Sequence, residues 1–207
     1  LFAVELGMAR VIEGLGVRPD VMVGHSFGEI SALTFAGVWD VETAYRVVEA
    51  RIKAAESIIN SGGPKLGMMS VICSDEQRDA ILQLSGGKVV LTNINAPGRF
   101  VCAGELDAVK RTVAVAESFG TEARLLPIGA AFHSPFMKPA REPFRRAIRD
   151  IPCSPPRIPV LSTISGEYVE TDTFDSEYLS NPLSAQLTTQ LNLPREVGRL
   201  YDEGTRL

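Results

Sequence analysis

The chain has 207 residues, of which 45% are hydrophobic and 22% are charged, a balance typical of a globular protein with a substantial core. Its formal net charge is −4 and no cluster of lysine or arginine stands out, so nucleic-acid binding and membrane-surface binding, which both depend on a concentrated positive field, are not expected. No apolar stretch approaches the roughly 20 residues that span a bilayer, and three widely spaced cysteines argue against a disulfide framework or a zinc site and fit a reducing cytoplasm.

The first part of the chain predicts the start of an open α/β sheet. Residues 1–15 have helical spacing without a basic leader or cleavage site, so we expect a chain that starts partway into a domain rather than a signal peptide. Residues 20–24, DVMVG, form an apolar run typical of a buried parallel strand. Helices are expected over residues 28–37 and 41–57, the second with Asp40 as its N-cap.

The middle of the chain predicts an inserted subdomain. A glycine-rich link at residues 60–67 precedes six segments in the order strand, helix, strand, strand, helix, strand, which matches a ferredoxin-like unit. These segments are residues 68–73, 75–85, 88–95, 99–104, 105–120 and 122–129. After them we expect a helix over residues 139–151, a strand over 160–165 and one or two final helices.

A serine between two glycines lies where the first buried strand turns into a helix. Gly24, Ser26 and Gly28 in VMVGHSFGEISAL fit the pattern G-x-S-x-G. A turn this tight leaves no room for side chains two residues on either side of the serine, which would explain both glycines. The hydroxyl then lies at a helix N-terminus, where free N–H groups favour negative charge. We predict that Ser26 is a nucleophile; the alternative is a structural turn in which it caps the helix.

Only two histidines can supply the base that a serine hydroxyl needs near neutral pH. His25 is adjacent to the serine, so its side chain should leave the sharp turn in another direction. His133, in AAFHSP, follows the inserted segment, and its order after the serine is that of α/β-hydrolase-like sheets. We therefore predict that His133 is the base; the alternative is a structural histidine.

An arginine lies on the apolar face of the helix predicted over residues 41–57. Arg51 follows Val47 by four residues and Val48 by three, so it points along the inward stripe. A buried guanidinium is costly unless an anion meets it, and that anion is either a buried glutamate or a carboxylate of the substrate. Lys53, two residues on, faces the other way and is expected to be a solvated surface charge.

Four segments in this order resemble the malonyl-CoA:acyl carrier protein transacylases, and more closely the acyltransferase domains of type I polyketide and fatty acid synthases: GHSFGEISAL, EARIKAAE, TNINAPGRFVCAGE and AAFHSPFM. The resemblance runs across almost the whole chain. It implies an α/β fold with an α/β-hydrolase-like large subdomain over residues 1–61 and 130–207, incomplete at both ends. It also implies a ferredoxin-like small subdomain over residues 62–129.

The resemblance implies an activity as well. A malonyl extender unit would pass from malonyl-CoA to the phosphopantetheine thiol of an acyl carrier protein, through an acyl-serine, in polyketide (antibiotic) or fatty acid biosynthesis. His133 would take the proton of Ser26, an N–H of Phe27 would help to hold the oxyanion, and Arg51 would clamp the malonyl carboxylate. No acidic third member stands out, so a Ser-His dyad is implied, its imidazole oriented by a backbone carbonyl near Gln186. No metal or bound cofactor is implied.

Further residues are implied to line the substrate site: His25, Phe27, Phe132, Asn95 and Gln186. Phe132 resembles malonyl-selective members, because its bulk would crowd an α-methyl group, a discrimination worth about 1–3 kcal/mol. Phe27 agrees with this selectivity, whereas Ala130 departs from the usual malonyl pattern. For Asn95 in NINAPG, the alternative is a turn-forming asparagine.

The match to the family pattern is incomplete. A GQGSQ-like loop that would supply a second oxyanion donor would lie before Leu1, and an EVGPG-like segment after Leu207. We therefore expect the central part of a longer acyltransferase domain, with neighbouring ketosynthase and carrier domains in the same chain. The alternative is a serine hydrolase that releases acyl groups to water, although a hydrolase has no use for a cation aimed at the acyl pocket. A non-catalytic docking domain is disfavoured because Ser26, His133 and Arg51 are all present.

Overall fold

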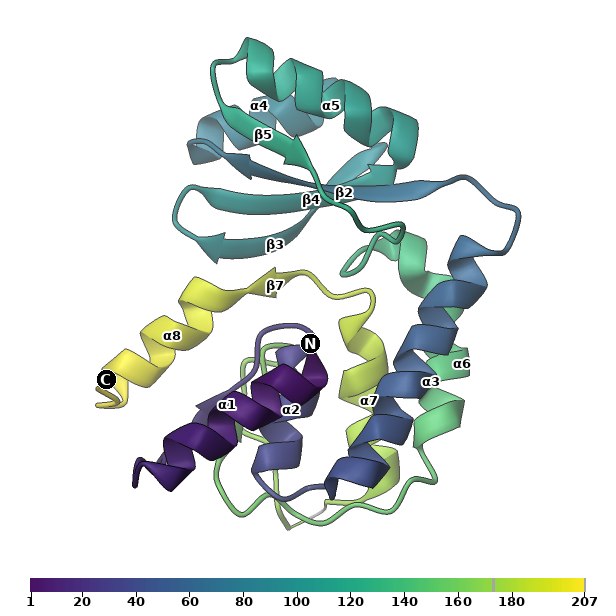
Figure 1. Ribbon diagram of the computed structural model, residues 1–207. Coiled ribbons are helices and arrows are strands. Elements are labelled where there is room, and N and C mark those ends of the chain that lie inside the picture. The colour runs from purple at the N-terminus through teal and green to yellow at the C-terminus, as the bar shows by residue number, and fades with distance from the viewer. Residues whose placement is uncertain (173, 207) are drawn as a thin grey trace.

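The computed structural model describes residues 1–172 and 174–206, and the predicted α/β class is confirmed. Figure 1 shows two parts, a mainly helical part below and a sheet with two covering helices above. The lower part holds α1 (Phe2–Gly14), β1 (Met22–Val23), α2 (Gly28–Phe35), α3 (Val41–Ile59), the 3₁₀ turn η1 (Pro135–Met137), α6 (Lys138–Ile148), β6 (Val160–Leu161), α7 (Ser176–Gln186) and α8 (Leu193–Asp202).

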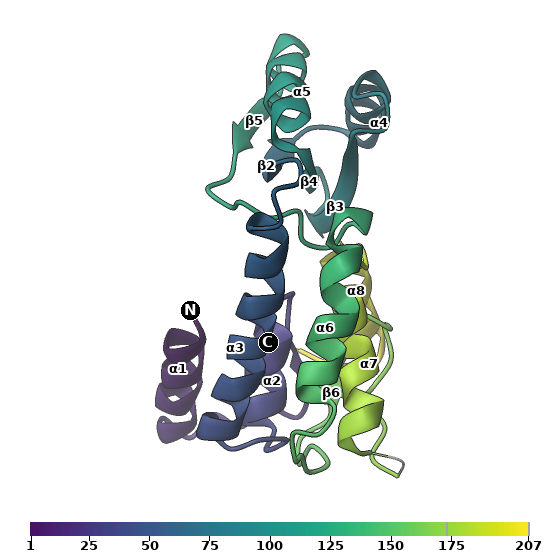
Figure 2. The same cartoon turned by 90° about the vertical axis from the view of Figure 1, so that its right-hand side faces the viewer.

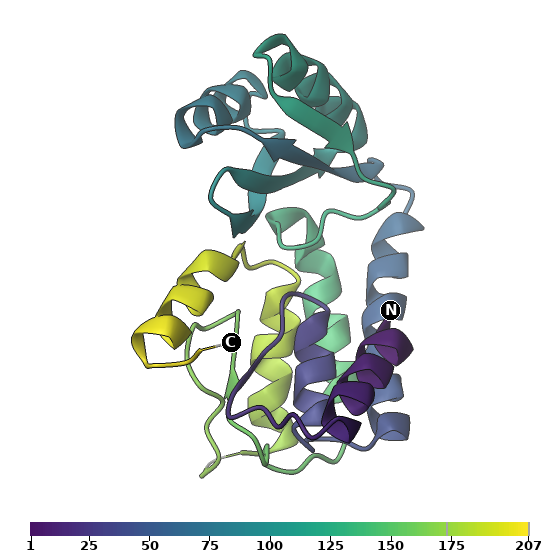
Figure 3. The same ribbon diagram turned by 60° about the vertical axis from the view of Figure 1, so that its left-hand side comes forward.

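The lower part is built around one large apolar core and a very short parallel sheet. Met22 pairs with Val160 and Val23 with Leu161, so the predicted strands at residues 20–24 and 160–165 are shortened to two residues each. Helices α3, α6 and α7 pack side by side in this part (Figure 2), and α1 lies against α2 (Figure 3). Their buried faces form a single cluster that includes residues of α2, α3, α6 and α7.

The predicted N-cap of α3 is present. The Asp40 side chain accepts a hydrogen bond of 2.7 Å from the backbone N–H of Thr43. The cap fixes where the helix starts, and the helical period then decides which residues point inward. Ala44, Val47 and Arg51 are all buried on that face, as the spacing predicted.

The upper part has the strand order of a ferredoxin-like unit. Its members are β2 (Leu66–Ile72), α4 (Asp75–Leu84), β3 (Val89–Ala96), β4 (Arg99–Glu105), α5 (Leu106–Ser118) and β5 (Glu122–Leu125). The strands are antiparallel in the order β5-β2-β4-β3, and α4 and α5 cover the face turned away from the lower part (Figure 1). Four strands and two helices were predicted here, and all six are present.

A fifth strand, β7 (Leu191–Asn192), was not predicted. It pairs in parallel with β3, Asn93 with Leu191 and Ile94 with Asn192, and so links the C-terminal segment to the upper sheet. Two residues carry no recognisable strand period. Asn192 is also the N-cap of α8, because its side chain accepts from the N–H of Arg195, so the local signal there is helical.

The cysteines are free, as expected, but only Cys102 is fully buried. Burial raises the pKa of its thiol to about 12. Cys73 and Cys153 are partly exposed. Among the described residues, no helix is both long enough and apolar enough to cross a bilayer.

Candidate active site

Two residues with unusual backbone conformations face each other across the lower part. Ser26, between β1 and α2, has φ +56°, and His133, just before η1, has φ +62°. Within residues 1–172 and 174–206 they are the only non-glycine residues with positive φ. Such conformations cost about 1–3 kcal/mol each and persist where the surrounding fold imposes them, often at functional sites.

The turn around Ser26 explains one of the two glycines. A Cβ on Gly24 would lie 2.3 Å from the carbonyl oxygen of Gly28 and 2.4 Å from the Cα of Glu29, so only glycine fits. A Cβ on Gly28 would meet nothing within 4 Å. The prediction that both glycines are required by crowding is therefore wrong for Gly28, because this residue already lies in the first turn of α2, where an added Cβ has open space.

Ser26 is hydrogen-bonded to His133 and does not cap the helix. Its Oγ lies 2.7 Å from His133 Nε2, and the N-cap of α2 is Phe27, which makes no side-chain cap bond. The two side chains predicted to meet across 107 residues of sequence are therefore in contact. The contact favours the nucleophile interpretation over the helix-cap alternative.

The imidazole of His133 is held in one orientation. Its Nδ1 donates to the backbone carbonyl of Gln186 at 2.8 Å, and its backbone N–H donates to the carbonyl of Leu187 at 2.8 Å. With the proton on Nδ1, Nε2 is left as the acceptor that faces the Ser26 hydroxyl. Burial, together with the positive charge of Arg51, lowers the pKa of His133 to about 4, so the imidazole is a neutral base at physiological pH.

Arg51 is buried and makes no direct ion pair, although the charge of the buried Glu29 acts on it at longer range. It is 7% exposed, and none of the ion pairs among the described residues involves it. Its guanidinium lies 5.6 Å from the ring centre of Phe27 and 5.0 Å from that of Phe132, and its Nε has no hydrogen-bond acceptor. Burial lowers the pKa of Arg51 to about 10, so it stays charged near neutral pH. The alternative explanation of this residue, a buried glutamate, is therefore met in part: Glu29 acts on Arg51 through its charge and through the amide of Gln186, but the two side chains form no direct ion pair.

Gln186, at the end of α7, touches three of the groups already described. Its side-chain Nε2 donates to the backbone carbonyl of Ser26 at 2.9 Å, and its Oε1 accepts from Arg51 at 3.3 Å. Its backbone carbonyl holds His133. The sequence pointed to a carbonyl near this position but gave no indication that the amide side chain bridges the nucleophile turn and the arginine.

Glu29 was missed by the sequence analysis. It lies in the first turn of α2 and is 2% exposed, and it accepts hydrogen bonds from Ser162, Thr163 and Gln186. A glutamate in the first turn of a helix is common, since it interacts well with the helix dipole. Nothing in the local sequence therefore distinguishes it from a surface residue.

The remaining predicted residues lie beside this cluster. The Phe132 ring is 6.4 Å from the His133 ring. The side chain of His25 is hydrogen-bonded to Asn95, and the Ser26 hydroxyl is bonded to His133 instead. Asn95 lies within strand β3, and the turn after it is made by Pro97 and Gly98, so the turn-forming alternative is wrong.

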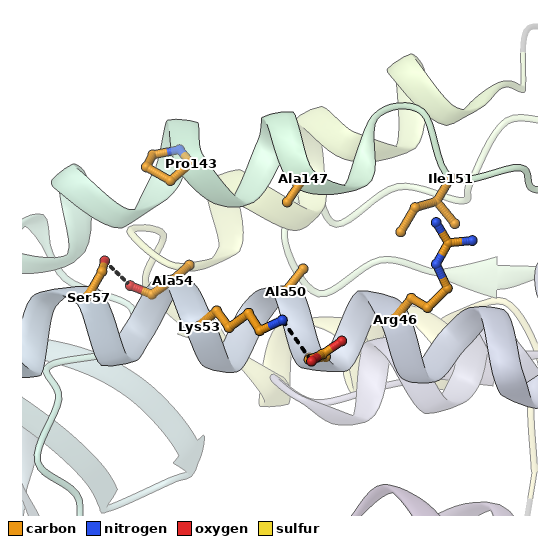
Figure 4. Close-up of a pocket in the computed structure, with 9 residues that line it drawn as sticks. Arg46, Ala50, Lys53, Ala54, Ser57, Pro143, Ala147 and Ile151 are labelled. Carbon is orange, nitrogen blue, oxygen red and sulfur yellow. Dashed lines mark hydrogen bonds and ion pairs between the residues drawn. The ribbon is translucent and has the colours of Figure 1, made fainter.

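One cavity of the lower part borders the serine turn, and another lies apart from the site. One of about 320 Å³ lies beside the Ser26 turn and is lined by His25, Gly24 and residues of α1 and α2. Another of about 350 Å³ lies between α3 and α6 (Figure 4), and it contains none of the predicted site residues. Lys53 borders this second cavity; it is exposed and paired with Glu49 at 2.7 Å, as predicted for a surface charge. In the described part of the chain, no group of histidine, cysteine and carboxylate side chains could hold a metal ion.

Comparison with known proteins gives consistent results. The acyl transferase domain family matches residues 1–196. Polyketide synthase GfsA from Streptomyces halstedii is 32% identical over 202 residues, which are 98% of this chain and 2% of that protein. The chain therefore spans only a small part of the curated relatives that it matches.

Solved structures agree with this match. The acyltransferase domain from the second module of the salinomycin polyketide synthase has a TM-score of 0.78 and 32% identity, over 99% of this chain and 46% of that chain. A malonyl-transacylase in complex with a type II polyketide synthase acyl-carrier protein has a TM-score of 0.84 and 29% identity, over 99% of this chain and 66% of that one.

Proposed function

The chain belongs to the acyl transferase domain family, and on that basis we propose that it loads a malonyl group from malonyl-CoA onto the phosphopantetheine thiol of an acyl carrier protein. The observation that carries this proposal is the convergence of a serine hydroxyl, a neutral imidazole and a buried guanidinium that makes no direct ion pair and whose Nε has no hydrogen-bond acceptor. A dicarboxylic half-thioester has a group for each of these residues: its thioester can react with Ser26, and its free carboxylate can bind Arg51.

The first half of the reaction acylates the serine. His133 Nε2 takes the proton of Ser26 as Oγ attacks the thioester carbonyl carbon of malonyl-CoA. The N–H of Phe27, the residue after the nucleophile, donates to the developing oxyanion. As the tetrahedral intermediate collapses, the C–S bond breaks and the sulfur takes the proton from His133, so that coenzyme A leaves as a thiol.

The second half reverses these steps with a new thiol. The phosphopantetheine thiol gives its proton to His133 and attacks the malonyl-serine ester. The C–O bond breaks, the proton returns to Ser26 Oγ, and malonyl carrier protein is released. The carbonyl of Gln186 stabilises the imidazolium that forms in each half, so that no carboxylate is needed as a third member.

We also propose the two-subdomain organisation, with the large subdomain over residues 1–61 and 130–207 and the small one over 62–129. The two sheets support it, with one strand crossing the boundary: β7 belongs to the C-terminal segment and pairs with β3 of the small subdomain. Synthase relatives far longer than this chain suggest neighbouring ketosynthase and carrier domains in the same protein. Malonyl-CoA chemistry and the free cysteines fit a cytoplasmic enzyme.

Intact-mass spectrometry of the full-length protein after incubation with malonyl-CoA tests this function. We expect a persistent malonyl adduct that is absent in Ser26→Ala and that disappears when a phosphopantetheinylated carrier protein is added, with malonyl appearing on the carrier. Rapid release of malonate to water without an adduct or a malonylated carrier would instead favour the hydrolase.

A further inference from the structure

A fully buried carboxylate lies behind the serine and is not used in the mechanism above. Glu29 Oε1 accepts a hydrogen bond from Ser162 Oγ at 2.6 Å, and its Oε2 accepts from Thr163 Oγ1 at 3.0 Å. Oε2 also accepts from the Gln186 Nε2 at 3.1 Å. An isolated buried carboxylate is costly, and three donors aimed at one indicate that the fold is built to hold it.

The same Gln186 nitrogen joins this carboxylate to the nucleophile turn. Nε2 has two protons, and it gives one to Glu29 and the other to the backbone carbonyl of Ser26. Its Oε1 is thereby turned toward Arg51. An ionised carboxylate can only accept hydrogen bonds, so it requires the NH₂ end of the amide on its own side and sets the orientation of Gln186.

We propose that Glu29 is a positioning residue that, through the amide of Gln186, holds the Ser26 turn, Arg51 and His133 in the arrangement needed for serine acylation. This inference rests on the proposed function only in taking Ser26 and His133 as the acylating pair. It does not depend on which acyl group is transferred.

The ionisation of Glu29 gives the proposal a measurable signature. Burial raises the pKa of Glu29 to about 7, whereas the pKa of His133 is lowered to about 4. Arg51 on α3 is the charged group that interacts with Glu29, and its positive charge favours the ionised form of the carboxyl. The side chains in direct contact with Glu29 carry no charge; they are those of Ser162, Thr163 and Gln186. Protonation of Glu29 lets it donate as well as accept and loosens the amide, so Ser26 reactivity should fall as pH drops through about 7.

The experiment measures labelling of Ser26 in the full-length protein by a fluorophosphonate probe between pH 5.5 and 8.5. For the wild type we expect a rate that falls on the acid side with an apparent pKa near 7. Glu29→Gln keeps the shape of the side chain and removes its charge, so it should abolish this pH dependence. Its labelling rate at every pH should equal the rate of the wild type at pH 5.5, about tenfold below the wild-type rate at pH 8.5. A rate and pH profile identical to those of the wild type would overturn the proposal.

A second variant tests the same carboxylate without altering it. The hydrogen bond from Ser162 lowers the pKa of Glu29. In Ser162→Ala, the fall of the labelling rate on the acid side of the pH profile (the acid limb) should therefore move to higher pH. This variant carries the test even if Glu29→Gln does not fold. An unmoved limb in Ser162→Ala would show that the limb belongs to another group and would overturn the proposal.

A double-mutant cycle tests the route through Gln186. Gln186→Met keeps the chain length and the backbone carbonyl that holds His133 but removes the amide. If Glu29 acts through this amide, Glu29→Gln combined with Gln186→Met should react no more slowly than Gln186→Met alone, and additive losses would contradict the route. Because the probe carries no malonyl group, the wild type could fail the malonyl-CoA experiment and still pass this one, so the two failures are distinguishable.

Discussion

At the scale of single residues, the site depends on a serine and a histidine held in positive-φ conformations and joined by a 2.7 Å contact. The imidazole is buried and neutral, and the guanidinium next to it is buried and charged. Both features are costly in isolation, and both are what a reaction needs when it removes a proton from a hydroxyl and binds a carboxylate.

These residues were predictable because their types are scarce and their order is informative. With two histidines in the chain, one of them adjacent to the serine, His133 was nearly the only possible base. Arg51 could be placed by helical period alone. Glu29, Ser162 and Thr163 could not be predicted, because each is ordinary in its local sequence and acquires its role only when α2 and the segment after β6 meet.

Phe132 gives a prediction about selectivity at the residue scale. Its ring lies 5.0 Å from the Arg51 guanidinium, so it borders the place where the acyl chain would lie. Phe132→Ser should raise the ratio of methylmalonyl to malonyl loading by about tenfold, as expected when a bulky side chain no longer crowds one methyl group. Initial rates with the two coenzyme A thioesters measure this ratio. An unchanged ratio would remove Phe132 from the acyl pocket.

At the scale of elements, the tight connection from β1 to α2 positions the nucleophile. The strand has only two paired residues, so the turn is stabilised mainly by the helix that follows it and by side-chain contacts from the segment after β6. The sequence predicted the strand–turn–helix unit correctly but overestimated the strand. Pairing length depends on the partner strand, which lies about 140 residues away in this chain.

The two glycines of this connection give a matched prediction. Gly24→Ala places a Cβ against the backbone of Gly28 and Glu29 and should lower the free energy of unfolding by more than about 2 kcal/mol. Gly28→Ala has open space and a helical position, so it should raise that free energy by about 0.5–1 kcal/mol. Urea unfolding of both variants checks this difference. Equal effects would mean that the close approach of the strand to α2 is absent.

The ferredoxin-like part was predictable from segment order, whereas β7 was not. Three of the four antiparallel strands have seven or eight residues and β5 has four, so each is long enough to show a strand pattern in the sequence. Strand β7 has two residues whose pairing with β3 depends on the path of the whole C-terminal segment. The local sequence of β7 therefore does not predict this pairing.

At the scale of the whole molecule, two buried groups with opposite pKa shifts make stability depend on pH in opposite directions. The pKa of His133 is lowered to about 4, so between about pH 6.5 and 4 the unfolded chain binds the proton more readily, and stability falls as pH falls. The pKa of Glu29 is raised to about 7, so between about pH 4.5 and 7 the folded chain binds the proton more readily, and stability rises as pH falls. The two contributions oppose each other over most of this range.

Replacing either Glu29 or His133 should reveal the pH dependence of stability that the other residue contributes. Between pH 7 and pH 5, Glu29→Gln should lose more stability than the wild type does, and His133→Gln should lose less or gain, each by about 1–2 kcal/mol relative to the wild type. Urea unfolding at the two pH values gives these differences, and comparison between variants cancels the contribution of exposed carboxylates. Identical pH dependence in all three proteins would show that neither group is buried as described.

The central claim is that an acyl group bearing a carboxylate reacts at Ser26 with Arg51 as its counter-ion. The most direct test compares loading from malonyl-CoA and from acetyl-CoA in the wild type, Arg51→Ala and the exposed control Lys53→Ala. We predict that Arg51→Ala slows malonyl loading by about a hundredfold, as expected for the loss of a buried charged partner, while acetyl loading changes little and Lys53→Ala resembles the wild type for both. Equal losses of malonyl and acetyl loading in Arg51→Ala would contradict the claim.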